Sequence, residues 1–300
     1  MKAKLTFLLR LIALTVLYFV CFAAVSGALL PPLDEQPTAA QASATVVALL
    51  VVSFLNSAVL AYVILRSRWA GWKLVLSVFF IFYGVVTVMP QIETAFFITR
   101  LPPGMLSRLF LMGAVIAALW SPLAVLILGK RRLEGLNDGG NSRLSMPVKE
   151  WVWRLSLIAA SYLVVYFGFG YFVAWRSAAV RAYYGGSDPG SFLAQMRTVL
   201  RDTPWLVPLQ VMRAMLWTAL AVPVIRMMKG RWWEAGLAVA LLFAVVMNSQ
   251  LLIPNPFMPT EVRMLHLLET ASSNFLFGWL LVWLLRGRAR GRAGGIASQD

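Results

Sequence analysis

The chain has 300 residues, of which 60% are hydrophobic and 13% are charged. A soluble domain usually carries about twice that share of charged residues, and a single core could not bury so much apolar surface, so the composition excludes a soluble globular protein. The formal net charge of +15 does not indicate nucleic-acid binding, because the basic residues lie between long apolar runs rather than on one soluble face.

Eight apolar runs are long enough to cross a bilayer, which takes about 20 residues each. They predict an all-α polytopic membrane protein with about eight transmembrane helices. The first run holds the one cysteine, Cys21, which we interpret as a small buried hydrophobic residue. This run is also too long for the apolar region of a signal peptide. The spans are expected at residues 5–30, 43–66, 70–90, 106–129, 151–175, 204–227, 232–253 and 262–285.

The loops between these runs differ in charge. If the N-terminus lies in the cytoplasm, most of the 27 basic residues fall on the cytoplasmic side, as the positive-inside rule requires. We therefore expect an integral plasma (inner) membrane protein with both termini in the cytoplasm. Its expected partners are membrane lipids and no nucleic acid, and the oligomeric state is not indicated.

A polar linker at 133–150 divides the chain into two halves of four spans, 1–132 and 151–290, and 291–300 form a flexible cytoplasmic tail. Arg10 and Tyr18 in the first span recur at the same spacing as Arg154 and Tyr162 in the fifth. This favours a 4+4 parallel pseudo-repeat, an arrangement known in some transporters. Chance similarity between apolar helices is the alternative.

Two segments on the outer side have distinct patterns. Residues near 190–202 have apolar positions at helical spacing and predict a short helix in the outer interface. That helix would serve as a cap over the bundle, or as a mobile gate or a lipid-binding element. Residues 90–104 are rich in proline and predict a loop that carries Glu93 toward the outer mouth.

Charged side chains within a membrane span are costly and usually face a partner or a water-filled cavity. Arg213 is expected roughly 13 Å deep in the sixth span, with Gln210 on the same helix face. We expect Arg213 to pair with a carboxylate or an anionic ligand. In the eighth span, one stripe facing the bundle interior is predicted to contain Arg263, His266, Glu269, Thr270, Ser273 and Asn274.

His266 and Glu269 are three residues apart and can touch. A histidine beside a carboxylate can be a proton relay, a general acid–base pair or part of a metal site. A metal would need a third ligand such as Glu93. In the purely structural interpretation, Glu269 neutralises Arg213 and His266 only donates a hydrogen bond.

Three functions fit this pattern. The favoured one is a small transporter or permease-like protein with a polar site in the outer half of the bilayer, which takes a small anionic or lipid ligand. An intramembrane enzyme acting on a lipid or lipid-linked substrate, with His266 and Glu269 as its catalytic pair, is less favoured because the chain has no nucleophile elbow or phosphate-binding loop. The third is a non-catalytic scaffold. No cofactor is identified and no metal site is assigned. The candidate binding residues are Arg213, Gln210, His266, Glu269, Asn274, Arg263 and Glu93.

Overall fold

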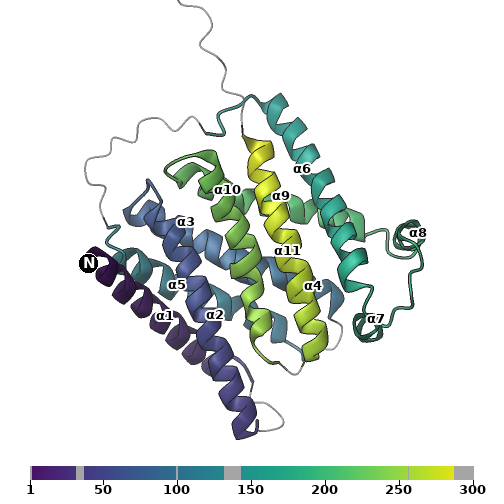
Figure 1. The fold of residues 1–300 in the computed structure, drawn as a ribbon, viewed down its shortest axis with the longest axis horizontal. Coiled ribbons are helices and arrows are strands. Elements are labelled where there is room, and N and C mark those ends of the chain that lie inside the picture. The colour runs from purple at the N-terminus through teal and green to yellow at the C-terminus, as the bar shows by residue number, and fades with distance from the viewer. Residues whose placement is uncertain (1, 32–36, 99–100, 132–142, 256, 287–300) are drawn as a thin grey trace, which may run out of the picture.

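The computed structural model describes residues 2–31, 37–98, 101–131, 143–255 and 257–286. This part of the chain is helical and contains eight helical segments that are long and apolar enough to cross a membrane. The prediction of an all-α multi-pass membrane protein is therefore confirmed, and Figure 1 shows the helices packed as one bundle. The first 10 residues of the expected linker (133–142) and the expected tail (291–300) lie outside the described residues.

Five of the eight spans are uninterrupted α-helices, and three contain a short π-helical segment (η). Beyond the spans, two short helices, α7 (Ala178–Tyr184) and α8 (Phe192–Asp202), connect the fifth span to the sixth. In chain order the spans are α1 (Lys2–Leu29), α2 (Ala39–Leu65), α3–η1–α4 (Gly71–Tyr83, Gly84–Val88, Met89–Phe97), α5 (Met105–Ile127), α6–η2 (Val148–Phe169, Gly170–Ala174), α9 (Leu206–Met227), α10–η3–η4 (Trp232–Leu241, Leu242–Val246, 3₁₀ Ser249–Leu252) and α11 (Thr260–Leu285).

The third span corrects the sequence prediction. It was expected to end at residue 90 and to be followed by a loop, but it remains helical to Phe97. Pro90 lies in the first turn of α4. The backbone N–H groups of a first turn have no partner within their own helix, so the missing N–H of proline costs no hydrogen bond there. The π-helical segment precedes Pro90, and in it the amide of Met89 donates to the carbonyl of Gly84. This local change in hydrogen bonding allows a new α-helix, α4, to begin at Met89. Glu93 therefore lies on a helix and not in a loop.

The helices form two groups that meet along the middle of the bundle. In the first group α1 packs on α2 and α5, and α5 packs on α3; in the second, α6 packs on α9 and α11, and α11 packs on α10. Figure 1 shows the first group on the left and the second on the right. Between the groups, α3 packs against α9, and α2 packs against α10 and η3.

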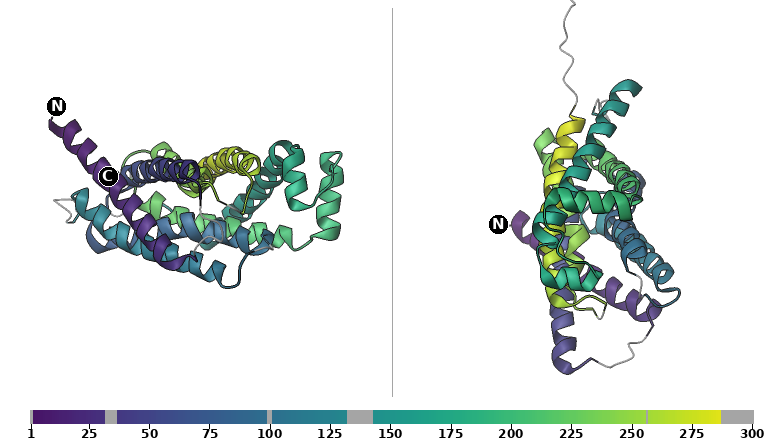
Figure 2. Two further views of the ribbon diagram at one scale, coloured as in Figure 1. Left: turned by 90° about the horizontal axis from the view of Figure 1, so that it is seen from below. Right: turned by 90° about the vertical axis from the view of Figure 1, so that its right-hand side faces the viewer.

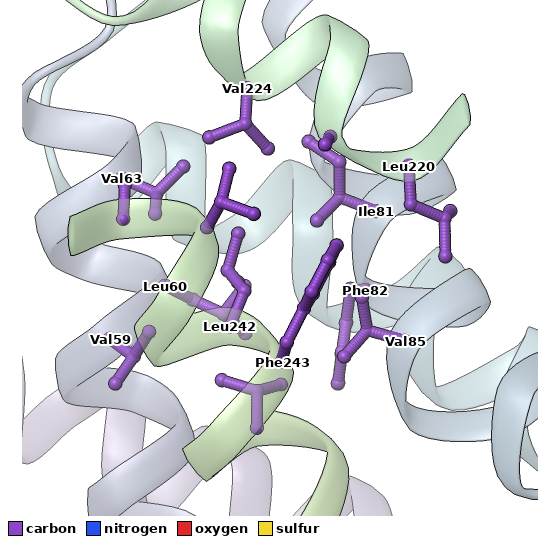
Figure 3. Close-up of a cluster of buried hydrophobic side chains, with 14 of the residues drawn as sticks. Val59, Leu60, Val63, Ile81, Phe82, Val85, Leu220, Val224, Leu242 and Phe243 are labelled. Carbon is purple, nitrogen blue, oxygen red and sulfur yellow. The ribbon is translucent and has the colours of Figure 1, made fainter. Parts of the chain in front are cut away.

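The apolar core lies at this junction. In Figure 3, side chains of α2, α3 and η1 interdigitate with side chains of α9 and η3. Leu60, Phe243 and Val224 are among those buried there. The helices approach closely at Gly84, where an added Cβ would lie 2.2 Å from Cδ2 of Leu220. A glycine at this point lets η1 contact α9 directly.

At one end of the bundle, the loops before α3 and α10 join the two groups. Ser67 and Met228 form an isolated antiparallel β-bridge, in which the amide of Arg68 donates to the carbonyl of Met227 at 2.7 Å. Nε of Arg66 also donates to Oε2 of Glu234 at 2.9 Å. We call this the bridge end of the bundle, and the opposite end the distal end.

Two buried amides, those of Asn56 and Asn248, connect helices across the core. Nδ2 of Asn56 donates to the hydroxyl of Tyr18 at 2.9 Å, and its Oδ1 accepts from Ser249 at 2.8 Å. The hydroxyl of Thr270 donates to Oδ1 of Asn248 at 2.6 Å. These bonds join α1 to α2, α2 to η4, and the end of the seventh span to α11.

The segment that joins the fifth and sixth spans leaves the bundle at the distal end. Figure 2 shows α7 and α8 at one edge of the molecule. The predicted helix near 190–202 corresponds to α8, and Oγ of Ser191 caps it by accepting from the amide of Ala194. None of the side chains of α8 is buried, and ring contacts from Phe192 to Tyr171 and Phe172 connect it to the fifth span.

Candidate functional site

Arg213 is the most deeply buried charge of the candidate site. It lies about 10 Å along α9 from the first residue of that helix, and its side chain is 2% exposed. Nη1 donates to Oε1 of Gln210 at 2.9 Å, so the two residues share a helix face as expected. The guanidinium carbon also lies 5.9 Å from the ring centroid of Tyr162 on α6.

The carboxylate partner of Arg213 is Glu93, which comes from the other group of helices. Nη2 of Arg213 lies 2.6 Å from Oε1 of Glu93. The structural interpretation that paired Arg213 with Glu269 is therefore wrong. The extension of the third span as α4 explains the difference, because it places Glu93 on a helix whose end is held by stacking of Phe96 on Trp205.

Two buried donors beside this ion pair have no acceptor. A guanidinium can only donate hydrogen bonds, so the amide oxygen of Gln210 must face Arg213 and its Nε2 must point elsewhere. Nε2 of Gln210 and Nε of Arg213 are both buried, and neither has a hydrogen-bond partner among the described residues. A buried unpaired donor is costly, so this position favours a ligand or water that supplies acceptor oxygens.

A second cluster is built around His266, the one histidine of the chain. Its Nδ1 lies 3.0 Å from Oε2 of Glu269 one turn later on α11, as the spacing predicted. Its Nε2 lies 3.0 Å from the hydroxyl of Tyr184, the last residue of α7. Both ring nitrogens are engaged, which forms a continuous chain from phenol through imidazole to carboxylate.

Tyr184 sets the protonation of this chain. Burial, followed by the negative charge of Glu93, raises the pKa of Tyr184 above its ordinary value. The phenol therefore stays protonated and can donate to Nε2 of His266. With a neutral imidazole, Nε2 then accepts from this phenol and Nδ1 donates to Glu269.

Two tyrosines of α6 connect the two clusters. Tyr162 and Tyr166 lie one turn apart, and each lies within electrostatic reach of Glu93, Arg213 and Glu269. The ion pair and the histidine chain thus form one polar region at the distal half of the bundle, bounded by α4, α6, α7, α9 and α11.

Two predicted site residues have other roles. Arg263 donates from Nη1 to the carbonyl of Ile253 at 2.5 Å and from Nη2 to Thr260 at 3.4 Å, which fixes the turn before α11. Asn274 donates to the sulfur of Met247 at 3.2 Å. Both are buried on the interior face of α11, but these contacts connect them to the seventh span and its loop rather than to either carboxylate.

The sequence did not predict the tyrosines. Nothing in the local pattern around Tyr184 indicates contact with α11. Tyr162 and Tyr166 carried a weak signal, since two tyrosines one turn apart place hydroxyl groups on one face of an apolar span.

A metal centre receives no support from the geometry. The described residues contain no group of three or more His, Cys, Asp or Glu side chains that could hold a metal ion. Glu93, the expected third ligand beside His266 and Glu269, is paired with Arg213 instead.

Comparison of the chain with known protein families, with curated proteins and with solved structures finds no match in any of the three.

Proposed function

We propose that the protein is a small permease-like transporter that binds the anionic group of its substrate at Arg213. The observation that carries the proposal is the incomplete pairing of this buried arginine. Its one carboxylate partner, Glu93, is 31% exposed, and two adjacent buried donors, on Arg213 and Gln210, have no acceptor among the described residues. A structural ion pair is stabilising only when its remaining donors are satisfied, whereas a binding site keeps donors for its ligand.

The location of the pair also favours transport. Glu93 belongs to the third span and Arg213 to the sixth, so they meet where the two groups of helices meet. Transporters built from repeated halves bind their substrates at such junctions, near the middle of the bilayer.

We further propose that the two groups are the halves of a 4+4 parallel repeat. The hydrogen bond from Asn56 of α2 to Tyr18 of α1 has a counterpart in the bond from Trp217 of α9 to Tyr162 of α6. These pairs join the first span to the second and the fifth to the sixth.

A second pair of contacts supports the same correspondence. Nη1 of Arg10 donates to the carbonyl of Leu128, after the fourth span, at 3.5 Å. Arg154 donates in the same way to the carbonyl of Leu284, at the end of the eighth span. Each arginine therefore connects the first helix of its half to the last.

The halves differ in polarity at the position of the site. Around Tyr18, the first half has a cavity of about 50 Å³ whose lining includes Leu109 and Met112 of α5. In the second half, the last span carries His266 and Glu269 instead, with Nδ1 of His266 3.0 Å from Oε2 of Glu269.

The basic loops support an orientation for this transporter. The bridge end carries Arg66, Arg68, Lys130, Arg143 and Lys229, and loops rich in Lys and Arg stay in the cytoplasm. We propose that the bridge end faces the cytoplasm of a plasma membrane and that the site opens toward the outside.

Reconstitution tests the transport proposal. Purified protein in liposomes would be assayed for uptake of radiolabelled acetate, phosphate and sulfate, with Arg213→Gln as the site variant. Arg108→Gln is the matched control, because this arginine is exposed at the distal end and donates to the carbonyl of Leu29. We expect uptake of at least one anion by the wild type and the control, and none by Arg213→Gln. Equal uptake by both variants would refute the site.

The chain from Tyr184 through His266 to Glu269 favours an intramembrane enzyme as the second candidate, because it could exchange a proton with a lipid-linked substrate. Incubation of the protein with membrane lipid extract, followed by mass spectrometry, tests this function. Products that form with the wild type but not with His266→Gln would favour the enzyme. A scaffold predicts neither uptake nor products.

A further inference from the structure

We propose that the ligand is a small monocarboxylate that replaces Glu93 on Arg213, and that Glu93 carries a proton across the membrane together with it. This inference rests on the proposed transport function and specifies its substrate class and its coupling ion.

The first step is the position of Glu93, which occupies the place of a ligand carboxylate. Its Oε1 lies 2.6 Å from Nη2 of Arg213. Of the two side chains, that of Glu93 is 31% exposed and that of Arg213 is 2% exposed. The accessible side of the pair is therefore that of Glu93, and an incoming anion would meet this carboxylate before it meets the guanidinium.

The second step is the arrangement of donors. A carboxylate on Nη2 can place its second oxygen toward the neighbouring donors, and Nε of Arg213 and Nε2 of Gln210 are the two that have no acceptor. Glu93 leaves both unused. A free carboxylate is not tied to a helix and can take the geometry that satisfies more of them, since planar carboxylates suit the fork of a guanidinium.

The third step concerns charge. Among the described residues, Arg213 is the buried cation that pairs with Glu93. A monoanion neutralises Arg213. A dianion such as sulfate would leave an extra buried negative charge, which is costly in a low-dielectric site. The site therefore favours a monocarboxylate over a dianion.

The fourth step links the ligand to a proton. When the ligand displaces Glu93 from Arg213, the carboxylate of Glu93 is left without a cationic partner. A proton taken up from the aqueous side then neutralises this carboxylate. Conversely, protonation of Glu93 leaves Arg213 unpaired and favours the anion. Proton binding and anion binding strengthen each other equally. One proton and one monocarboxylate then cross together and leave on the other side, without net charge movement.

Other titratable groups lie around Glu93. Any test must therefore distinguish the protonation of Glu93 from the protonation of these groups. His266 is the group among them whose ordinary pKa lies closest to neutral. The groups that interact with Glu93 from the neighbouring helices are Arg213 on α9, Tyr162 and Tyr166 on α6, and Tyr184 on α7. His266 and Glu269 on α11 belong to the same polar region through Tyr184.

Binding of acetate to the purified full-length protein tests the inference. Titration calorimetry would be run at about pH 5.5 and about pH 8, on either side of the ordinary pKa of histidine, with sulfate at equal ionic strength as the competing probe. The variants are Glu93→Gln, His266→Gln and the control Glu261→Gln, whose carboxylate is exposed at the start of α11.

We expect wild type and Glu261→Gln to bind acetate at least tenfold more tightly at the lower pH. Glu93→Gln should bind acetate tightly at both pH values, because its neutral amide competes for Arg213 less strongly than a carboxylate and does not titrate. Sulfate should not bind. Acetate binding by Glu93→Gln that keeps the wild-type pH dependence would overturn the inference.

If Glu93→Gln does not fold, His266→Gln decides instead. It should keep the tenfold pH dependence of the wild type, and its loss would assign the proton to His266 and contradict the inference. The uptake assay separates this failure from that of the transport function. Acetate uptake that requires Arg213 but does not change with pH would support the proposed transport function and contradict the proposed coupling to a proton.

Discussion

The unequal exposure of the two members of the Glu93–Arg213 pair predicts unequal costs when either is removed. Glu93→Gln leaves a cation that is 2% exposed, and loss of one partner of a buried pair costs about 3–5 kcal/mol. Because the new amide oxygen can still accept from the guanidinium, we expect about 3 kcal/mol of lost unfolding free energy. Arg213→Gln leaves a carboxylate that is 31% exposed and can be hydrated, so the expected cost is about 1–2 kcal/mol.

The double variant Glu93→Gln/Arg213→Gln contains neither charge. Its cost should fall below the sum of the single variants by about 2 kcal/mol, which is within the range of coupling between residues in contact. Equilibrium unfolding of the detergent-solubilised protein, in buffer free of carboxylates, gives all three values. The exposed controls Glu261→Gln and Arg108→Gln should stay within about 0.5 kcal/mol of the wild type.

Two results would refute this reasoning. Additive costs would show that the two side chains do not interact in solution. A larger cost for Arg213→Gln than for Glu93→Gln would show that the arginine stabilises the fold through contacts other than its carboxylate, and that its burial does not require an anion.

Three further predictions concern contacts elsewhere in the bundle. Gly278→Ala places a Cβ 2.9 Å from the backbone of α10 and should cost about 1–3 kcal/mol in unfolding experiments; Gly168→Ala, with no atom within 4 Å, should cost nothing. Tyr184→Phe removes the donor to the single imidazole and should change its tautomer signals in NMR spectra of histidine-labelled protein, whereas Tyr183→Phe should leave them unchanged. Asn56→Leu removes hydrogen bonds to two other helices and should lower the unfolding free energy by about 1–3 kcal/mol; wild-type stability would show that these bonds do not form.

Length and hydrophobicity were sufficient to predict the spans, because an apolar run of bilayer length has few alternatives to a membrane helix. The end of the third span was not predictable in the same way. Pro90 is typical of a loop, and only the π-helical segment before it allows the helix to restart and carry Glu93 onward. A local change in helix type has no signal in hydrophobic periodicity.

In the candidate site, likewise, contacts within one helix could be predicted from the sequence and contacts between helices could not. Contacts within one helix, Gln210 with Arg213 and His266 with Glu269, follow from residue spacing. Contacts between helices do not, so the sequence could not show that Arg213 takes Glu93 rather than Glu269 as its partner. That choice depends on which helices are neighbours and how far each extends.

A tilt of the two groups of helices about the β-bridge between the loops of Ser67 and Met228 would be amplified at the distal end of the bundle. The third span begins just beyond the bridge and reaches Glu93 about 33 Å away, and α9 ends at the bridge. A rotation of about 5° about this fixed point displaces the far end of such an arm by about 3 Å, while the bridge itself moves very little. Such a displacement would lengthen the 2.6 Å contact between Glu93 and Arg213 beyond the roughly 4 Å limit of an ion pair, so a small tilt of one group would open this contact.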